Sequence, residues 1–400
     1  MRLIPCCLVA LATLSLHCSS DSDDGPGPVA GGAGSSGSSG GTGGAGASYG
    51  GSGYAGTTAG TAGAGAAGAS AGSGGSSGAS AAGSAGASGG AGTAGSGGAG
   101  GAAGQADFWA AGDIPKAKNV LMFRFLNRTM GRFKDSEVYW RFEHGDTKEL
   151  HSIAEQPTYD MIANASGRMY FFICAEGDAK CASDPSKSDY FDFIEHTIGT
   201  DQYNGNTTRV DAFGLKIAMR LHSAAGDDVT VGEDEATFAE TREATFAKFL
   251  AESPAEFAPC AKAPFRIVEP GACGFNKDGA NAHYYDAFVD EMWANNGITI
   301  PKPGPNGSGL AAYPDLSAAI FRHVGAAAGT FDAAGKRLDK DLWKDPSTFY
   351  TAAPANYYAR FWHKHSIDGR AYGFPYDDVG SYSTYVSRKN PEYLLIAIGF

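Results

Sequence analysis

Several features of common protein classes are scarce or missing in this sequence. Its 31 Lys and Arg are outnumbered by 43 Asp and Glu among 400 residues, which gives a formal net charge of −12. This balance argues against nucleic acid as a partner, but it does not oppose a neutral polysaccharide. No GxSxG motif or Gly-rich phosphate loop stands where a strand would lead into a helix, so esterase and nucleotide-binding functions have no support. We predict that the protein needs no cofactor and is a monomer.

No apolar run at the N-terminus is long enough to cross a membrane. Residues 1–18, MRLIPCCLVALATLSLHC, combine an early Arg2 with a short apolar run, which predicts a secretory signal peptide. Cys18 precedes the polar stretch SSDSDDGPG and is a candidate lipobox cysteine, which would serve as a lipid anchor and membrane tether. We therefore predict a secreted protein or a cell-surface, outer-membrane lipoprotein. Secretion without an anchor stays open, because His17 stands where a lipobox usually has a small residue.

Residues 19–106 contain very little charge and very few large apolar side chains. They consist mostly of Gly, Ala and Ser, as in GGAGSSGSSGGTGGAG. Such a segment cannot bury enough apolar surface to offset the entropy lost on ordering. We predict a disordered linker that holds a folded module away from its point of attachment.

Cysteines are few, and four of them follow the linker: Cys174, Cys181, Cys260 and Cys273. In an exported protein these four predict disulfides, for which three connectivities exist. The local pairs Cys174–Cys181 and Cys260–Cys273 are the simplest. A zinc site is disfavoured because paired CxxC spacing is missing, and we predict no metal.

The chain from Phe108 onward alternates apolar and polar residues in a way that predicts a mainly β fold with an α/β insertion. Dense or alternating apolar runs predict strands at 120–127, 137–142, 169–175, 216–223 and 393–400, and we also expect strands to return near Tyr357. Helical spacing in two segments after Asp228 and in a third near Tyr313 predicts helices. We therefore predict a β-sandwich domain over 107–227 and 326–400, with an inserted α/β domain over 228–325.

Two carboxylates stand out because each lies in an otherwise apolar, strand-like run. Glu195 lies in FDFIEHTI and Asp211 in TRVDAFGL, sixteen residues apart, with a polar loop between the runs. Two acids are what the acid-assisted hydrolysis of a glycosidic bond requires. The alternative is that both are solvated or salt-bridged surface groups.

Further candidates lie toward the C-terminus. Tyr376, Asp377 and Asp378 in FPYDDVG are candidates for substrate binding because aromatic residues flank the acids, although a turn or hydrogen-bonding role is the alternative. On a strand, at most one of two adjacent acids can face a groove. His363 and His365 would share one face of a strand, but no third metal ligand is evident nearby, so surface or groove histidines are favoured.

The runs FDFIEHTI, TRVDAFGLKIAMRL, IDGRAYGFPYDDVG and NPEYLLIAIG, in this order, resemble glycoside hydrolase family 64, the bacterial β-1,3-glucanases of thaumatin-like fold. The resemblance implies a thaumatin-like β-sandwich or barrel domain and a mixed α/β domain that flank a wide groove. It also implies an exported endo-1,3-β-glucanase that cleaves laminarin- or curdlan-like glucan with inversion and releases short oligosaccharides. In that family pattern Glu195 would be the general acid, Asp211 the base and Thr197 a sugar contact, while His196 stands where an aromatic residue is expected. A catalytically inactive, β-glucan-binding surface lipoprotein is the alternative.

The proposed pair places a geometric demand on the strands. If the two runs paired directly around Asn204 and Gly205, Asp211 would oppose Ile198 and point to the sheet face opposite to Glu195. A shared groove therefore requires a register shift, a bulge or non-adjacent strands.

Overall fold

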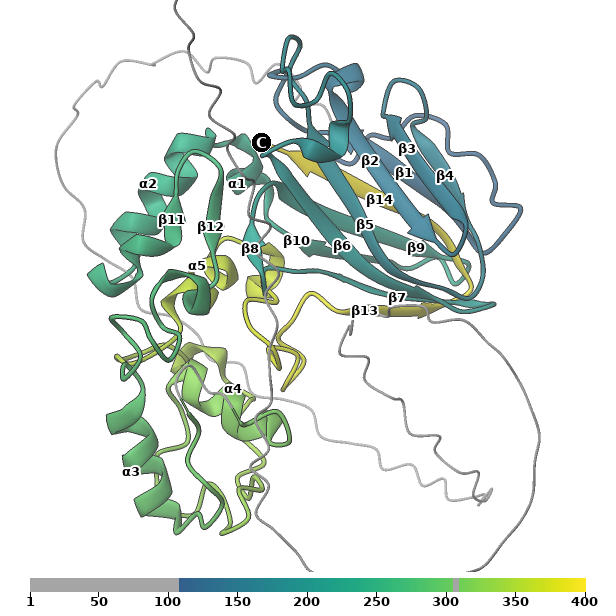
Figure 1. Ribbon diagram of the computed structural model, residues 1–400. Coiled ribbons are helices and arrows are strands. Elements are labelled where there is room, and N and C mark those ends of the chain that lie inside the picture. The colour runs from purple at the N-terminus through teal and green to yellow at the C-terminus, as the bar shows by residue number, and fades with distance from the viewer. Residues whose placement is uncertain (1–107, 305–308) are drawn as a thin grey trace, which may run out of the picture. The chain divides into compact units, whose positions relative to one another are not determined.

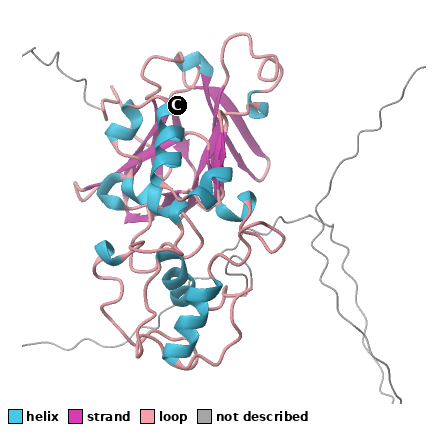
Figure 2. Ribbon diagram, turned by 90° about the vertical axis from the view of Figure 1, so that its left-hand side faces the viewer, coloured by secondary structure: helices cyan, strands magenta, loops and turns pink. Residues whose placement is uncertain are grey.

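The computed structural model describes residues 108–304 and 309–400 (Figures 1 and 2). The predicted signal peptide 1–18, the candidate anchor Cys18 and the predicted linker 19–106 lie outside these residues and stay predictions. The described part contains two large β-sheets, a small third sheet and five α-helices. No helix within the described ranges is long and apolar enough to cross a membrane.

The first large sheet has five strands in the order β10-β9-β14-β1-β4. Its strands are β1 (Leu121–Asn127), β4 (Thr158–Met161), β9 (Lys216–Ser223), β10 (Asp228–Gly232) and β14 (Pro391–Gly399). The C-terminal strand β14 pairs parallel with β1 and antiparallel with β9. The end of the chain therefore lies in the middle of this sheet, as the apolar run at 393–400 predicts.

The second large sheet has six antiparallel strands in the order β13-β7-β6-β5-β2-β3. Its strands are β2 (Val138–His144), β3 (Thr147–Ser152), β5 (Ala165–Ile173), β6 (Phe191–Ile198), β7 (Gln202–Thr207) and β13 (Val386–Lys389). Side chains of both large sheets share one hydrophobic core, in which Phe125 stacks on Trp140 with ring centroids 4.8 Å apart. This shared core makes the pair of sheets a β-sandwich.

Most of the remaining elements pack around a second hydrophobic core. They are α2 (Arg242–Glu252), α3 (Asp286–Asn296), α4 (Pro314–Arg322), α5 (Tyr357–Lys364) and the small sheet of β8 (Ala212–Phe213), β11 (Ala261–Lys262) and β12 (Arg266–Val268). Helix α1 (Glu235–Ala239) instead packs Phe238 against Ala218 and Ala397 of the first large sheet. Phe213 of β8 stacks on Trp362 of α5 with centroids 4.7 Å apart. The segment that directly follows Asp211 therefore belongs to this second core.

Two expectations about the boundary of the insertion need correction. Strand β10 pairs with β9, so residues 228–232 belong to the sandwich and not to the insertion. The second core reaches as far as Phe374, so much of 326–385 packs with the helices.

The strand expected near Tyr357 is the helix α5, because Tyr358, Phe361 and Trp362 recur at helical spacing and are buried on one side. The Asn356 side chain caps its first turn by accepting from the amide of Ala359, 3.0 Å away.

The two disulfides are the local pairs. Cys174 is bonded to Cys181, and Cys260 is bonded to Cys273.

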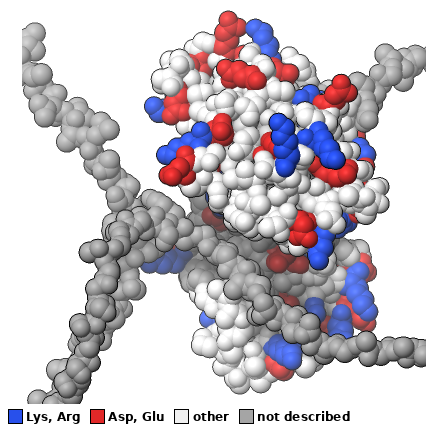
Figure 3. Space-filling model, turned by 90° about the vertical axis from the view of Figure 1, so that its right-hand side faces the viewer, with Lys and Arg blue, Asp and Glu red and all other residues white. Residues whose placement is uncertain are grey.

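Charged side chains of both signs are interspersed on the face shown in Figure 3.

His196 is an unusual member of the sandwich core. Its ring is 3% exposed and lies between Phe123 and Phe142, and neither ring nitrogen has a hydrogen-bond partner among the described residues. Burial, followed by repulsion from His144, lowers the pKa of His196 from 6.5 to about 4.

We expect this histidine to make the fold sensitive to acid. Between pH about 6.5 and about 4 only the unfolded chain takes up the proton, so the free energy of unfolding should fall by about 3 kcal/mol across this window and stay constant above it. His196→Phe should remove that part of the pH dependence, as measured by urea unfolding at a series of pH values. His283→Gln, which changes an exposed histidine, is the control. An unchanged slope in His196→Phe would contradict the assignment.

Candidate active site

Strand β6 presents Glu195 on the face of the six-stranded sheet that is turned away from the sandwich core. Ile194 and Ile198 are buried in that core, whereas Glu195 is 35% exposed and Thr197 is exposed. The register places Arg168 of β5 opposite Glu195 and Ser166 opposite Thr197. The hydroxyls of Ser166 and Thr197 lie 3.0 Å apart. Period-two alternation thus gives this face a polar row beside the acid.

Asp211 reaches the same place from the link between two strands. The polar stretch QYNGNT, expected as a loop, is β7 and pairs directly with β6. Asp211 lies after β7 and immediately before β8 of the small sheet, with its side chain 53% exposed. The expectation that Asp211 lies on a strand is therefore wrong: it lies in the link between β7 and β8 and approaches Glu195 from there.

Arg168 joins the two acids. Its Nε and Nη2 lie 3.2 and 3.1 Å from Oε1 of Glu195, and its Nη1 donates to Oδ2 of Asp211 at 3.1 Å. The nitrogens of one guanidinium are roughly 2–2.5 Å apart, and each bonded oxygen lies about 3 Å from its nitrogen. Oε1 of Glu195 and Oδ2 of Asp211 are therefore at most about 9 Å apart. This upper bound admits both the roughly 6.5–9.5 Å carboxyl separation of inverting glycosidases and the roughly 5–5.5 Å of retaining ones.

The environment of Arg168 keeps its guanidinium charged. The guanidinium lies over the ring of Phe193, 4.0 Å from its centroid. Burial would lower the pKa of Arg168, but attraction to Asp211 and then to Glu195 outweighs it, so the pKa is raised. The site thus holds one permanent cation between two acids.

A buried ion network fixes the segment that carries Asp211. Arg209 donates to the carboxylate of Asp192 on β6 at 2.7 Å and to that of Glu233 at 2.7 and 2.8 Å, and the side chains of all three are at most 3% exposed. The Asp192 carboxylate also accepts from the amides of Gly214 and Leu215 at 2.8 and 3.0 Å. A Cβ on Gly214 would meet the carbonyl oxygen of Phe191 at 1.9 Å, so only glycine permits this close approach.

The other candidate residues have different surroundings. Thr197 lies beside Glu195, as described above, and Tyr376 lines a cavity described below. Asp378 is exposed and lies outside the lining of that cavity. Their contact with a substrate stays a prediction.

Asp377 needs correction as a substrate contact, because it is completely buried and bonded within the protein. Its carboxylate accepts from Arg322 at 2.9 Å and from the amide of Gly373 at 2.9 Å, and it lies 3.0 Å from Nε2 of His363. Burial would raise the pKa of Asp377, but His363 and Arg322 outweigh it and the pKa is lowered. The hydrogen-bonding role is therefore the correct one of the two readings.

The two histidines also differ from expectation. His363 is on the helix α5, is 4% exposed and contacts Asp377 and the carbonyl of Gly369. His365 follows the helix and lies 3.1 Å from Glu252. They share neither a strand nor a groove surface.

Arg168 and Glu269 are site residues that the sequence reasoning missed. Arg168 could have been found by pairing the apolar run at 169–173 with FDFIEHTI as antiparallel neighbours, which sets it opposite Glu195. The Glu269 amide donates to the carbonyl of Asp211 at 3.2 Å. Burial first, and then the charge of Asp211, raise the pKa of Glu269 against two lowering backbone hydrogen bonds. No sequence pattern pointed to this residue.

The comparison with protein families decides the assignment. The model of the family described as beta-1,3-glucanase, glycoside hydrolase family 64, matches residues 161–300 and 298–398. The chain belongs to glycoside hydrolase family 64. Both acids lie within the matched residues, whereas strands β1, β2 and β3 of the sandwich precede them.

Two named relatives of the chain agree with this membership. The chain is 25% identical over 255 residues to proteins named glucan endo-1,3-beta-glucosidase from Arthrobacter sp. (strain YCWD3) and from Cellulosimicrobium cellulans. These matches cover 52% of this chain but only 45% of each relative, so the chain spans less than half of their length.

Two solved structures have a similar fold. The family 64 laminaripentaose-producing beta-1,3-glucanase from Paenibacillus barengoltzii is 30% identical, with a TM-score of 0.56 over 72% of this chain and 77% of that one. A beta-1,3-glucanase domain from Clostridium beijerinckii has a TM-score of 0.59 over 72% of this chain and all of that one, at 22% identity. The second likeness concerns the fold alone.

Proposed function

We propose that this protein is an endo-1,3-β-glucanase that hydrolyses β-1,3-glucan with inversion, with Glu195 as general acid and Asp211 as general base. The observation that carries the proposal is Arg168, which binds both carboxylates with one guanidinium. Membership of family 64 and the names of its relatives support the substrate class.

In the proposed reaction, Glu195 gives its proton to the glycosidic oxygen as the bond to the anomeric carbon breaks. Asp211 takes a proton from a water molecule that attacks the same carbon from the opposite face of the sugar ring. One sugar ring and one water molecule must therefore fit between the two carboxyl groups. The enzyme returns to its starting state when Asp211 releases its proton to solvent and Glu195 takes one up.

Arg168 would act in this scheme as a positioning residue. Its contacts go to Oε1 of Glu195 and Oδ2 of Asp211 and leave the second oxygen of each acid for proton transfer. Its stack on Phe193 restricts the guanidinium to this place. The two acids are thereby held apart at a set distance before the substrate binds.

The test is hydrolysis of a linear β-1,3-glucan, with the anomeric form of the first product followed by proton NMR. We expect the α-anomer to appear first, because inversion of a β-linkage produces it, and the β-anomer to grow by mutarotation. Activity is assayed in the culture medium, the membrane fraction and the cytoplasm, since the proposal includes export, which the two disulfides support.

Each outcome of this assay bears on one part of the proposal. A β-anomer that appears first would contradict inversion. Activity confined to the cytoplasm would contradict export. Binding of glucan without turnover would favour the inactive glucan-binding protein.

A further inference from the structure

Glu269, the residue that follows β12, places a third carboxyl group beside Asp211. Strand β12 pairs antiparallel with β8, and Val268 stands opposite Ala212. Continued by one residue beyond the strands, this register sets Glu269 opposite Asp211, and the Glu269 amide donates to the Asp211 carbonyl at 3.2 Å. Residues that stand opposite each other in an antiparallel pair carry their side chains on the same face, with Cβ atoms about 4.5–5.5 Å apart. The two carboxyl groups are therefore neighbours.

The turn after β12 holds the Glu269 side chain in place. Its carboxylate accepts from the amide of Gly271 and so caps the 3₁₀-helix Pro270–Cys273. Cys273, at the end of that helix, is joined to Cys260 by a disulfide. The position of the carboxylate is therefore fixed by bonds within the protein.

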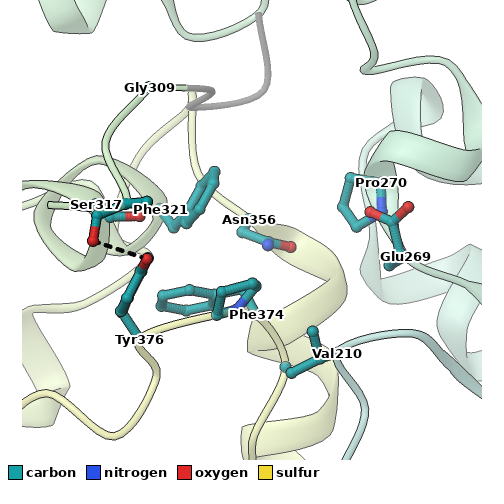
Figure 4. A pocket seen from close by; sticks show the side chains of 12 residues that line it. Val210, Glu269, Pro270, Gly309, Ser317, Phe321, Asn356, Phe374 and Tyr376 are labelled. Carbon is teal, nitrogen blue, oxygen red and sulfur yellow. Dashed lines mark hydrogen bonds between the residues drawn. The ribbon is translucent and has the colours of Figure 1, made fainter. Parts of the chain in front are cut away.

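Glu269 also lines a cavity of about 300 Å³ beside the segment that carries Asp211. Figure 4 shows Glu269 and Val210, the residue before Asp211, on one side of this cavity and Tyr376 on the other. Burial in this wall raises the pKa of Glu269 above 4.5 against two backbone hydrogen bonds, and the charge of Asp211 raises it further. The charges of the two carboxyl groups therefore act on each other.

The neighbours of Asp211 act on a carboxylate in opposite directions. Arg168 lies 3.1 Å from Oδ2 of Asp211, and a cation at this distance favours the ionised form and makes it a weaker base. A second carboxylate has the reverse effect, because two neighbouring negative charges repel each other. This repulsion ends when Asp211 takes up a proton, which is the step that the proposed reaction requires of it.

We propose that Glu269 is a positioning residue that acts through Asp211: its negative charge favours the transfer of a proton from the attacking water to that base. The role rests on the proposed reaction, in which Asp211 is the base. It adds a third carboxyl group that transfers no proton itself.

The two carboxyl groups titrate as a coupled pair, and Glu269 takes up the first proton. Its pKa lies above the ordinary value of a glutamate, which itself exceeds the ordinary value of an aspartate. Turnover should therefore fall in two steps as the pH is lowered. The first step is a partial loss of about three- to tenfold, when Glu269 becomes neutral and Asp211 becomes a weaker base. The second step is the complete loss, when Asp211 itself is protonated.

The other titratable groups around the pair leave these two steps visible. They are Arg168 and Glu195 on the six-stranded sheet, Tyr358 of α5, and Tyr376 in the cavity wall. Burial first, with Glu269 as a smaller contribution, raises the pKa of Tyr358. An arginine and a tyrosine do not change charge under acidic conditions. Glu195 must be protonated to act as the acid, so its ionisation lowers turnover on the alkaline side.

The experiment measures kcat on a linear β-1,3-glucan as a function of pH for the wild type and two variants. Glu269→Gln keeps an oxygen for the amide of Gly271 but carries no charge, so its profile should show only the second step. Its kcat should be about three- to tenfold below that of the wild type at neutral pH and equal to it between the two steps. KM should stay within about twofold. Glu269→Asp keeps the charge and should restore both steps.

A matched control changes an exposed acid nearby. Glu256→Gln removes one exposed carboxylate from the 3₁₀-helix Ala255–Cys260 and should give the wild-type profile. A loss of kcat in Glu269→Gln that is the same at every pH would show a merely structural role and overturn the inference. A two-step profile in Glu269→Gln would also overturn it.

A titration that does not depend on turnover tests the interaction of the two charges. Carbon-13 NMR follows the Glu269 carboxyl in the wild type and in Asp211→Asn, where the midpoint should move by about half a pH unit or more to lower pH. An unchanged midpoint would overturn the inference even if the enzyme is active. A wild type that does not cleave the glucan, or full turnover in Asp211→Asn, would instead refute the proposed function, and the NMR midpoint would still decide whether the two carboxyl groups interact.

Discussion

Replacing Glu195 by Gln or Asp211 by Asn is expected to lower the turnover of β-1,3-glucan by about 10²–10⁴-fold. Each replacement keeps the volume of the side chain and an oxygen that can accept from Arg168, but removes the group that exchanges a proton. Glu195→Gln has no proton to give to the leaving oxygen. Asp211→Asn cannot accept a proton from the attacking water. Release of reducing ends from a linear glucan measures both.

A matched control separates this effect from a general loss of charge. Asp146→Asn changes one exposed carboxylate in the turn between β2 and β3 and should leave turnover unchanged. Both active-site variants should still bind glucan and unfold at nearly the wild-type temperature, since Glu195 and Asp211 are partly exposed. Activity within tenfold of wild type in either variant would remove that residue from its proposed role.

Most strands of the β-sandwich could be predicted from local patterns in the sequence. Strands β1, β2, β5, β6, β9 and β14 lie where apolar alternation or dense apolar runs predict them, and Gly297 ends α3 in the left-handed conformation expected of a C-cap. Strand β7 was missed because QYNGNT is almost entirely polar. Its Tyr203 and Thr207 are nevertheless buried, while the side chains between them line the polar face of the sheet. Helix α5 was missed because aromatic richness was given more weight than helical spacing.

The candidate site could be predicted only in part, for a physical reason. The two acids are visible as charges in apolar runs, but their approach depends on long-range pairing. Arg168 meets Glu195 through the register of β5 with β6, and Asp211 arrives from the link that leads into β8. Asp377 shows the opposite case: an acid with aromatic neighbours in sequence resembles a binding residue until its buried partner Arg322, on α4, is known.

Arg209 stabilises the fold and also fixes the segment that carries Asp211. Its guanidinium is the bonded partner of two buried acids, Asp192 and Glu233, and its carbonyl accepts from the Tyr358 hydroxyl at 2.6 Å. Burial would lower the pKa of Arg209, but Glu233 and Asp192 outweigh it and the pKa is raised, so the cation persists at every pH at which the protein is folded. Removing this cation leaves two uncompensated buried acids and loosens the backbone two residues before Asp211.

We expect Arg209→Met to lower the free energy of unfolding by about 3–5 kcal/mol, as for other buried ion pairs that lose one partner. The melting temperature should fall by roughly 5–20 °C at about 2–4 °C per kcal/mol. Arg220→Met, which removes one partner of the half-exposed pair with Asp228, should cost about 1 kcal/mol or less. Urea unfolding of both variants makes the comparison, and equal losses would contradict the special role of Arg209.

Adding Asp192→Asn and Glu233→Gln to Arg209→Met should restore part of the stability but not the turnover of glucan. The three neutral side chains no longer form the ion pairs that fix the Asp211 segment against β6.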